Sequence, residues 1–186
     1  MAILTQNTQP ALWLQIVHDA EALCAISLHE ELEAYLVFLL ARYINQPNFA
    51  HQRMAIKFLQ GMQLSPRMRA DALQGVGDEC LLLAGLYPHA AQHRLVRISY
   101  FVQLGRSAYR VISDRNNRIF AHLDMEFVAL MDVLQSIRQP DAGIDLLPLE
   151  AIELWQDTGS KRALRVLRRY TCALPVCEQN SPPGRS

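Results

Sequence analysis

GVGDECLLLAGLYP, residues 75–88, is the most apolar run in this chain. Two glycines stand near its start, two adjacent carboxylates follow them, and a proline ends it. A short apolar run between such breakers, with a long amphipathic segment directly after it, is typical of a buried helix. We therefore predict that a helix from about Asp78 to Tyr87 occupies the centre of an all-helical domain.

The two glycines, Gly75 and Gly77, leave two possibilities for where this helix begins. A pair so closely spaced either kinks one long helix or separates two helices. Asp78 suits a helix N-cap directly after Gly77, and Glu79 would then point to solvent. The alternative is functional, because a carboxylate beside Leu81–Leu83 loses water and its pKa rises unless a cation or a backbone donor compensates. We favour the N-cap interpretation.

Further helices are predicted on both sides of this run, because apolar residues recur there at three-to-four spacing. Ser27 followed by Glu30 forms a capping box. Gly105 lies inside another periodic segment, where a glycine indicates a close approach of two helices. The predicted helices are about Pro10–Leu23, Ser27–Asn45, Phe49–Met62, Ser65–Leu73, His89–Ser113, Arg115–Ile137, Pro148–Trp155 and Ser160–Tyr170.

The predicted fold class is all-α: one irregular bundle of seven or eight helices over residues 1–170, with residues 171–186 as a weakly ordered tail. The chain of 186 residues is 51% hydrophobic, enough to bury the core of a single domain. Its apolar stretches are far shorter than the roughly 20 residues that span a bilayer, so we expect no membrane span. The N-terminus has no signal-peptide pattern and the four cysteines are scattered, which favours the cytoplasm.

The sequence contains no pattern that indicates catalysis or a cofactor. None of the six histidines has a Glu three residues before it, which argues against a di-iron bundle site. His89 with His93, and His122 with Glu126, have the spacing of one helical face, but we expect surface residues there. Phosphate-loop, zinc and nucleophile-elbow motifs are absent. We therefore predict no catalytic residue, no metal site and no cofactor.

The alternative hypothesis is a ligand pocket around the two central carboxylates, Asp78 and Glu79. The segment after Pro88 offers Arg97 and Arg106 as partners for Asp78 and Glu79. Arginine and carboxylate groups pair in a bidentate manner when half-buried. Such a constellation between helices, with His122 nearby, would make the protein a helical ligand-binding protein or an enzyme.

Charge is segregated towards the C-terminus. The net charge is zero, so any attraction to nucleic acid has to come from a local patch. Residues 141–157 contain five acids and no base: Asp141, Asp145, Glu150, Glu153 and Asp157. Residues 161–169 contain five bases and no acid: Lys161, Arg162, Arg165, Arg168 and Arg169.

The basic segment predicts an amphipathic helix with a cationic outer face, and three interpretations compete. It binds nucleic acid or an anionic membrane surface through phosphate contacts, or it docks on an acidic protein partner. In the third, the acidic and basic helices form a hairpin around Gly159 and neutralise each other, which we favour because it requires no partner. Our leading hypothesis for the whole chain is a non-enzymatic protein that acts through protein–protein contact, as an adaptor, regulator or homo-oligomer.

Overall fold

The computed structural model describes residues 8–43, 53–87, 96–113, 118–138 and 146–170. Every regular element in these ranges is a helix. The helices are α1 (Thr8–Cys24), α2 (Glu30–Tyr43), α3 (Met54–Met62), α4 (Pro66–Leu86), α6 (Ile98–Ile112), α7 (Ile119–Met125), α8 (Phe127–Arg138), α9 (Pro148–Thr158) and α10 (Lys161–Tyr170). The all-α prediction is confirmed, although the described ranges alone hold nine helices, more than the seven or eight expected.

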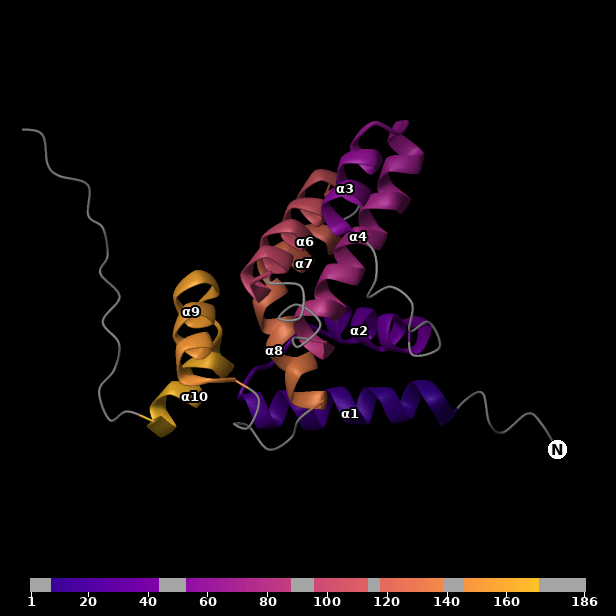
Figure 1. The fold of residues 1–186 in the computed structure, drawn as a ribbon. Helices are drawn as coiled ribbons and strands as arrows, with labels where there is room; N and C mark the ends of the chain where they lie inside the picture. Colours follow the sequence, from indigo (N-terminus) through magenta and orange to yellow (C-terminus); the bar gives the residue numbers. More distant parts are fainter. Residues whose placement is uncertain (1–7, 44–52, 88–95, 114–117, 139–145, 171–186) are drawn as a thin grey trace, which may run out of the picture.

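Helix α4 is the central element, as the apolar run predicted. It packs against α6, α8 and α3. In Figure 1 it slants upward through the molecule, with α3 beside its upper part, α1 and α2 at the base, and the α9–α10 hairpin to the left. The five side chains from Cys80 to Ala84 are at most 1% exposed. Helix α4 begins at Pro66 and passes through both Gly75 and Gly77 without a break, so one helix stands where two were possible.

Helices α4 and α6 approach closely through glycines. A Cβ atom on Gly77 would lie 2.4 Å from the ring of Tyr109 on α6. A Cβ atom on Gly105 of α6 would lie 3.0 Å from Cβ of Cys80 on α4 and 2.6 Å from the ring of Phe127. The predicted close approach at Gly105 is therefore confirmed. The expected helix His89–Ser113 is not continuous, because Val96 and Arg97 are not helical and α6 begins at Ile98; its first residues, 89–95, lie outside the described ranges.

The long predicted helix Arg115–Ile137 is divided in two. Helix α7 ends at Met125, and α8 begins at Phe127. Around the break, the Glu126 N–H donates to the His122 carbonyl, while the Leu130 N–H donates to the Glu126 carbonyl. The apolar stripe continues through the break, which explains why periodicity alone merged the two helices.

The first two helices form a second pair at the base of the bundle. Helix α1 packs on α2 and α8. The Ser27 capping box is not formed, because α2 begins at Glu30 and the His29 carbonyl accepts from the Leu32 and Glu33 N–H groups. Instead, a carboxylate oxygen of Glu21 accepts from the Leu28 N–H at 2.6 Å. A side chain of α1 thus satisfies the connection that leads into α2.

The C-terminal helix pair forms around Gly159 as predicted, whereas the expected charge neutralisation between its two helices stays a prediction. Helix α9 ends at Gly159, whose φ of 74° is the left-handed conformation that glycine adopts most easily. Ser160 then caps α10, since its hydroxyl accepts from the Ala163 N–H at 3.0 Å. Ala151 of α9 is buried with Val166 and Leu167 of α10. The two helices are therefore joined by apolar packing as well as by their connection.

Several expectations fall outside the described residues: the start of the Phe49–Met62 helix, the acids Asp141 and Asp145, the pair His89 and His93, and the tail 171–186. Within the part of the chain that is described, no helix is both long and apolar enough to cross a bilayer.

Candidate functional site

Asp78 lies in the interior of α4 and joins three helices. It is 2% exposed. The hydroxyl of Tyr35 on α2 donates to Asp78 Oδ1 at 2.5 Å, and the hydroxyl of Tyr109 on α6 donates to the same oxygen at 2.8 Å. The Gln74 amide donates to the Tyr35 hydroxyl at 3.3 Å. The N-cap interpretation of Asp78 is therefore wrong, because the side chain is turned into the core and accepts from tyrosines.

Burial controls the protonation of this cluster. Desolvation raises the pKa of Asp78 to about 6, although the hydrogen bonds from Tyr35 and Tyr109 oppose the shift. Burial and the nearby carboxylate also raise the pKa of both tyrosines, so their hydroxyls stay protonated as donors. Asp78 is therefore a carboxyl group that exchanges its proton near neutral pH inside the fold.

Replacing Asp78 with asparagine should stabilise the protein above pH 6. The folded-state pKa of about 6 exceeds the ordinary 3.8. The carboxyl thus stabilises the fold fully below its ordinary pKa, and this contribution is lost as the pH rises through about 6. The shift corresponds to about 3 kcal/mol. We expect Asp78→Asn to recover about 1–2 kcal/mol, because its amide oxygen accepts from the tyrosines while its new N–H groups need acceptors.

Urea unfolding of both proteins, from about two pH units below the shifted pKa of Asp78 to about two units above it, measures this difference in the free energy of unfolding. The free-energy gap should open as the pH rises and close in acid. Asp71→Asn, at an exposed position of α4, is the matched control and should follow the wild type. A pH-independent gap would show that Asp78 does not titrate within the fold.

The other three residues of the hypothetical pocket have different partners. Both carboxylate oxygens of Glu79 accept from Lys57 Nζ on α3 at 2.8 Å. Arg97 is 3.5 Å from Glu153 on α9. Arg106 donates through Nε to Asp124 on α7 at 2.9 Å. The structure does not bring the two arginines to the two carboxylates, because each arginine is engaged by an acid on another helix.

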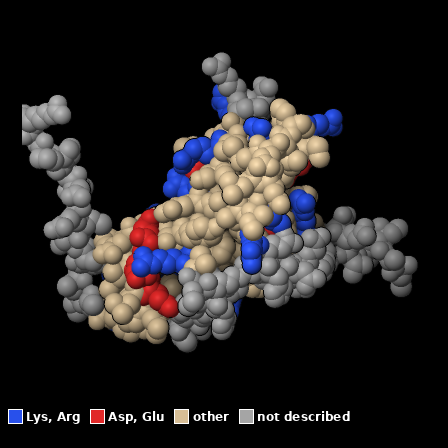
Figure 2. Space-filling model, turned by 45° about the horizontal axis from the view of Figure 1, so that its top comes forward, with Lys and Arg blue, Asp and Glu red and all other residues tan. Residues whose placement is uncertain are grey.

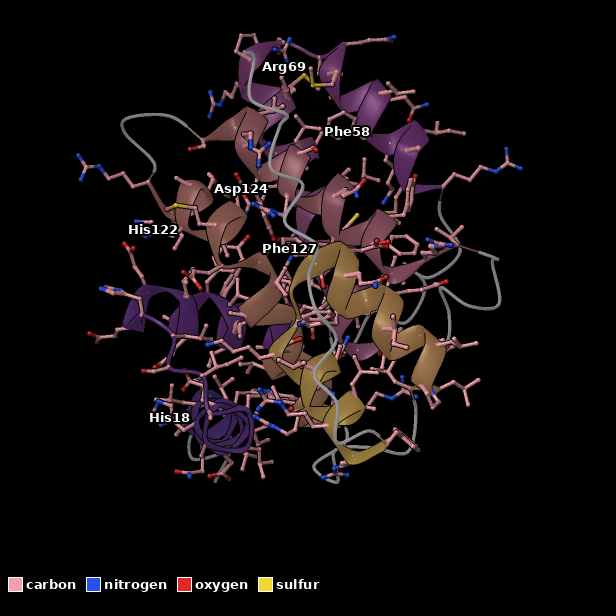
Figure 3. All side chains as sticks on the ribbon, turned by 90° about the vertical axis from the view of Figure 1, so that its left-hand side faces the viewer. His18, Phe58, Arg69, His122, Asp124 and Phe127 are labelled. Atoms are coloured by element: carbon pink, nitrogen blue, oxygen red, sulfur yellow. The ribbon has the colours of Figure 1, made fainter. Side chains whose placement is uncertain are left out.

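Asp124 is the electrostatic link between α6 and α7. Besides Arg106, Arg110 donates to it from Nε at 2.9 Å and from a terminal nitrogen at 3.0 Å. Burial alone would raise the pKa of Asp124, but the hydrogen bonds from Arg110 and Arg106 hold it below its usual value. In Figure 3, Asp124 lies among the helices, whereas His122 lies at the edge of the molecule. His122 Nδ1 is 3.5 Å from the exposed Glu31.

Two pockets lie away from the hypothetical site around Asp78 and Glu79. One, of about 270 Å³, lies between the start of α6 and α9 and is lined by Arg97, Glu153 and Asp157 among others. The second, of about 180 Å³, is apolar and includes Trp13 and Leu82 in its lining. Neither of these two pockets is lined by Asp78 or Glu79.

The basic helix α10 is partly turned inward. Arg162 is buried; its N–H donates to Asp132 on α8, and its guanidinium donates to Ser136. Arg165 donates to the carbonyls of Leu23 and Cys24, the last residues of α1, at 2.5 Å each. Lys161, Arg168 and Arg169 are exposed. The cationic outer face is therefore narrower than predicted, because two of its five bases hold the bundle together.

Asp132 is another buried acid, and its role was not predicted from the sequence. It is 1% exposed and accepts from the Ser160 hydroxyl at 2.6 Å. Burial raises its pKa, although bonds from Ser160 and from the first N–H groups of α10 oppose this. The carboxylate thus serves as a cap for α10 supplied by another helix.

One group of possible metal ligands exists among the described residues. His18 and Glu21 on α1 and Glu33 on α2 place one ligand atom each within 4.8 Å of the others. His18 Nε2 is 3.0 Å from a Glu33 oxygen. The hydrogen bond with Glu33 raises the pKa of His18, and this effect is larger than that of burial, which lowers it.

Helix α3 carries an exposed apolar stripe. Ile56, Leu59 and Met62 are 44%, 61% and 37% exposed and follow one another at three-residue spacing. On the opposite side of α3, Met54 is buried and Phe58 packs against the core. Most surface helices are polar on the side that faces water. Helix α3 is apolar on both sides.

Comparisons of this chain with protein-family models, with curated proteins and with solved structures found no match.

Proposed function

We propose that this protein acts through contact with another protein, as an adaptor, a regulator or a subunit of a homo-oligomer. The observation that carries the proposal is the exposed stripe of Ile56, Leu59 and Met62, which we call the α3 face. Exposed apolar patches on folded proteins mark interaction sites more often than chance. A helix that binds a hydrophobic groove presents apolar anchors three and four residues apart, and Ile56 with Leu59, and Leu59 with Met62, have the three-residue spacing.

The charge around the α3 face supports a partner of particular chemistry. Residues 53–70 contain four bases and no acid. Lys57 is paired with Glu79, and Arg69 donates to the Leu64 carbonyl, whereas Arg53 and Arg67 are exposed. Figure 2 shows a largely uncharged surface across the upper half of the molecule, with Lys and Arg at its edges. A partner with an apolar groove and an acidic rim would complement this surface.

The two other candidate functions have weaker support. The ligand-binding alternative loses the site on which it rested, because Asp78, Glu79, Arg97 and Arg106 are paired elsewhere. Nucleic-acid binding through residues 161–169 keeps three exposed bases. Phosphate contacts by three bases give a weaker, less salt-dependent complex than five would. The basic helix is better explained as a structural element with a modest positive surface.

Replacing Leu59 with lysine should weaken partner binding by about tenfold or more, because a charge would have to enter an apolar contact. Leu59 is 61% exposed, so the free protein should keep its stability. Tagged protein used as bait in native lysate, followed by quantitative mass spectrometry, measures capture. Size-exclusion chromatography with light scattering measures self-association.

Leu149→Lys is the matched control, since Leu149 on α9 is 75% exposed and lies away from α3. A specific partner should be lost with Leu59→Lys and kept with Leu149→Lys. The proposal is contradicted if the wild type is a monomer that captures nothing, or if both variants capture the same proteins as the wild type.

A further inference from the structure

The α1–α2 pair brings a histidine and two glutamates to one point. His18 and Glu21 are three residues apart on α1 and therefore share one helical face. Glu33 belongs to the first turn of α2. His18 Nε2 and a Glu33 oxygen are 3.0 Å apart, and the ligand atoms of all three residues lie within 4.8 Å of one another. In Figure 3, His18 lies on the side of α1, which is seen end-on, with α2 above it.

These distances match what a bound metal ion requires. Zinc binds imidazole nitrogen and carboxylate oxygen at about 2.0–2.2 Å, so neighbouring ligands of a tetrahedral site are about 3.4 Å apart. The 3.0 Å between His18 Nε2 and the Glu33 oxygen is within about half an ångström of that separation. The ligand atom of Glu21 lies within 4.8 Å of the other two and would have to approach them to reach the same ion. Open sites with three protein ligands leave a fourth position for water, and the 48% exposure of the His18 side chain leaves space for one.

Glu21 is held in place by a second contact. It is 8% exposed, and its Oε1 accepts from the Leu28 N–H at 2.6 Å. Ligating carboxylates usually have such an additional hydrogen bond, which fixes their orientation and strengthens the site. The Leu28 N–H belongs to the connection between α1 and α2. The same connection therefore positions the ligands of both helices.

The charge of the surrounding chain favours a cation at this point. Residues 1–41 contain five acids and no Lys or Arg. Glu33, Glu21 and Asp19 place negative charge near His18. Arg165, which reaches the end of α1 from α10, is engaged by the carbonyls of Leu23 and Cys24. A divalent ion would replace the proton of His18 and neutralise two carboxylates.

We propose that His18, Glu21 and Glu33 form a binding site for a divalent transition-metal ion of the zinc type. One imidazole and two carboxylates are a ligand set that such ions accept. The sequence does not predict this site, because Glu21 follows His18 instead of preceding it as in the Glu-x-x-His motif and Glu33 belongs to another helix. The bound ion would connect α1 to α2 at the surface, independently of the α3 face.

Titration of the chelator-treated full-length chain with ZnCl2 tests the site, with isothermal calorimetry and melting temperature as readouts. Cys172→Ser and Cys177→Ser are included in every protein so that these thiols do not bind zinc. The expected result is one ion per chain and a higher melting temperature. His18→Ala and Glu33→Gln should each weaken binding by about tenfold or more.

Two controls remove comparable groups nearby. Glu31→Gln removes the same charge from the same turn of α2. The double variant His29→Ala, His122→Ala removes two histidines outside the proposed site, whose ring centroids are 6.5 Å apart. Both should bind zinc within about twofold of the parent. Absence of binding by the parent, or binding that survives His18→Ala and Glu33→Gln or disappears in a control, overturns the proposal.

His18 and Glu33 are at or near the surface, so their variants should fold. Metal-free melting curves check this point. Glu33→Asp keeps the charge and shortens the side chain, and it should still lose most of the affinity. Unchanged zinc affinity in Glu33→Asp would mean that charge alone attracts the ion, which also overturns the site.

Discussion

Replacing Gly77 with alanine should lower the free energy of unfolding by about 3 kcal/mol, the upper part of the range for overpacked cores. The new Cβ atom would lie 2.4 Å from Cε1 and 2.7 Å from Cζ of Tyr109. This ring cannot move away easily. It is completely buried, it stacks on Phe120 with ring centroids 6.0 Å apart, and its hydroxyl is bound to Asp78. Helices α4 and α6 would have to separate instead.

Gly75→Ala is the matched control for this change. Gly75 is two residues earlier in the same helix, and no atom lies within 4 Å of the Cβ position there. Alanine should therefore raise the free energy of unfolding by about 0.5–1 kcal/mol through helix propensity alone. Urea unfolding followed by circular dichroism measures both. Equal stabilities of the two variants would contradict the close approach of α4 and α6.

Replacing Asp132 with alanine should cost about 3 kcal/mol, because it leaves the Ser160 hydroxyl and the Arg162 backbone N–H without their acceptor and removes a negative charge near the buried Arg162. Asp132 accepts from the Ser160 hydroxyl and from the Arg162 N–H. The loss should be concentrated in the C-terminal hairpin, where α10 is held to α8 through this carboxylate. Trypsin should therefore cleave after Arg162 and Arg165 faster than in the wild type.

The control for Asp132 is an acid of the same hairpin that faces water. Asp157→Ala, on the exposed side of α9, should change stability by less than about 0.5 kcal/mol. Asp132→Asn should fall between the two, because its amide oxygen still accepts from Ser160. An Asp132→Ala variant that melts like the wild type and resists trypsin equally would show that α10 is held by apolar packing alone.

The parts of the fold that could be predicted depend on local signals. Gly159 and Ser160 define the C-terminal hairpin through backbone conformation and capping, which act over a few residues. Apolar periodicity located the core of α4 for the same reason. The break between Met125 and Phe127 was missed because the stripe continues through it.

The roles of the buried acids depend on contacts between distant residues. Asp78 was interpreted as an N-cap from its neighbour Gly77, but its partner Tyr35 is 43 residues away. A signal for such acids does exist in the sequence. Asp124 lies on the same helical face as Phe120 and Phe127, and a charge inside an apolar stripe needs a buried partner. Spacing alone does not tell which residue that partner is.

The candidate metal ligands could be predicted only in part. His18 and Glu21 share one face of a predicted helix, which the sequence shows. Glu33 becomes the third ligand only because the short connection after Cys24 returns α2 alongside α1. The exposed α3 face could not be predicted from apolar periodicity either. Both sides of that helix are apolar, and only packing decides which side is covered.

Arg165 connects the two ends of the described chain, and this has a consequence for the order of folding. Its guanidinium binds the carbonyls of Leu23 and Cys24, which are 142 and 141 residues earlier. During synthesis, the end of α1 must wait for α10 to leave the ribosome before its carbonyls receive these donors. Contacts of such long sequence separation form late and slow the final step. The apolar side of α1 packs on α2 and α8, so part of it stays uncovered until α8 has been made, and chaperone contact with this helix should persist until then.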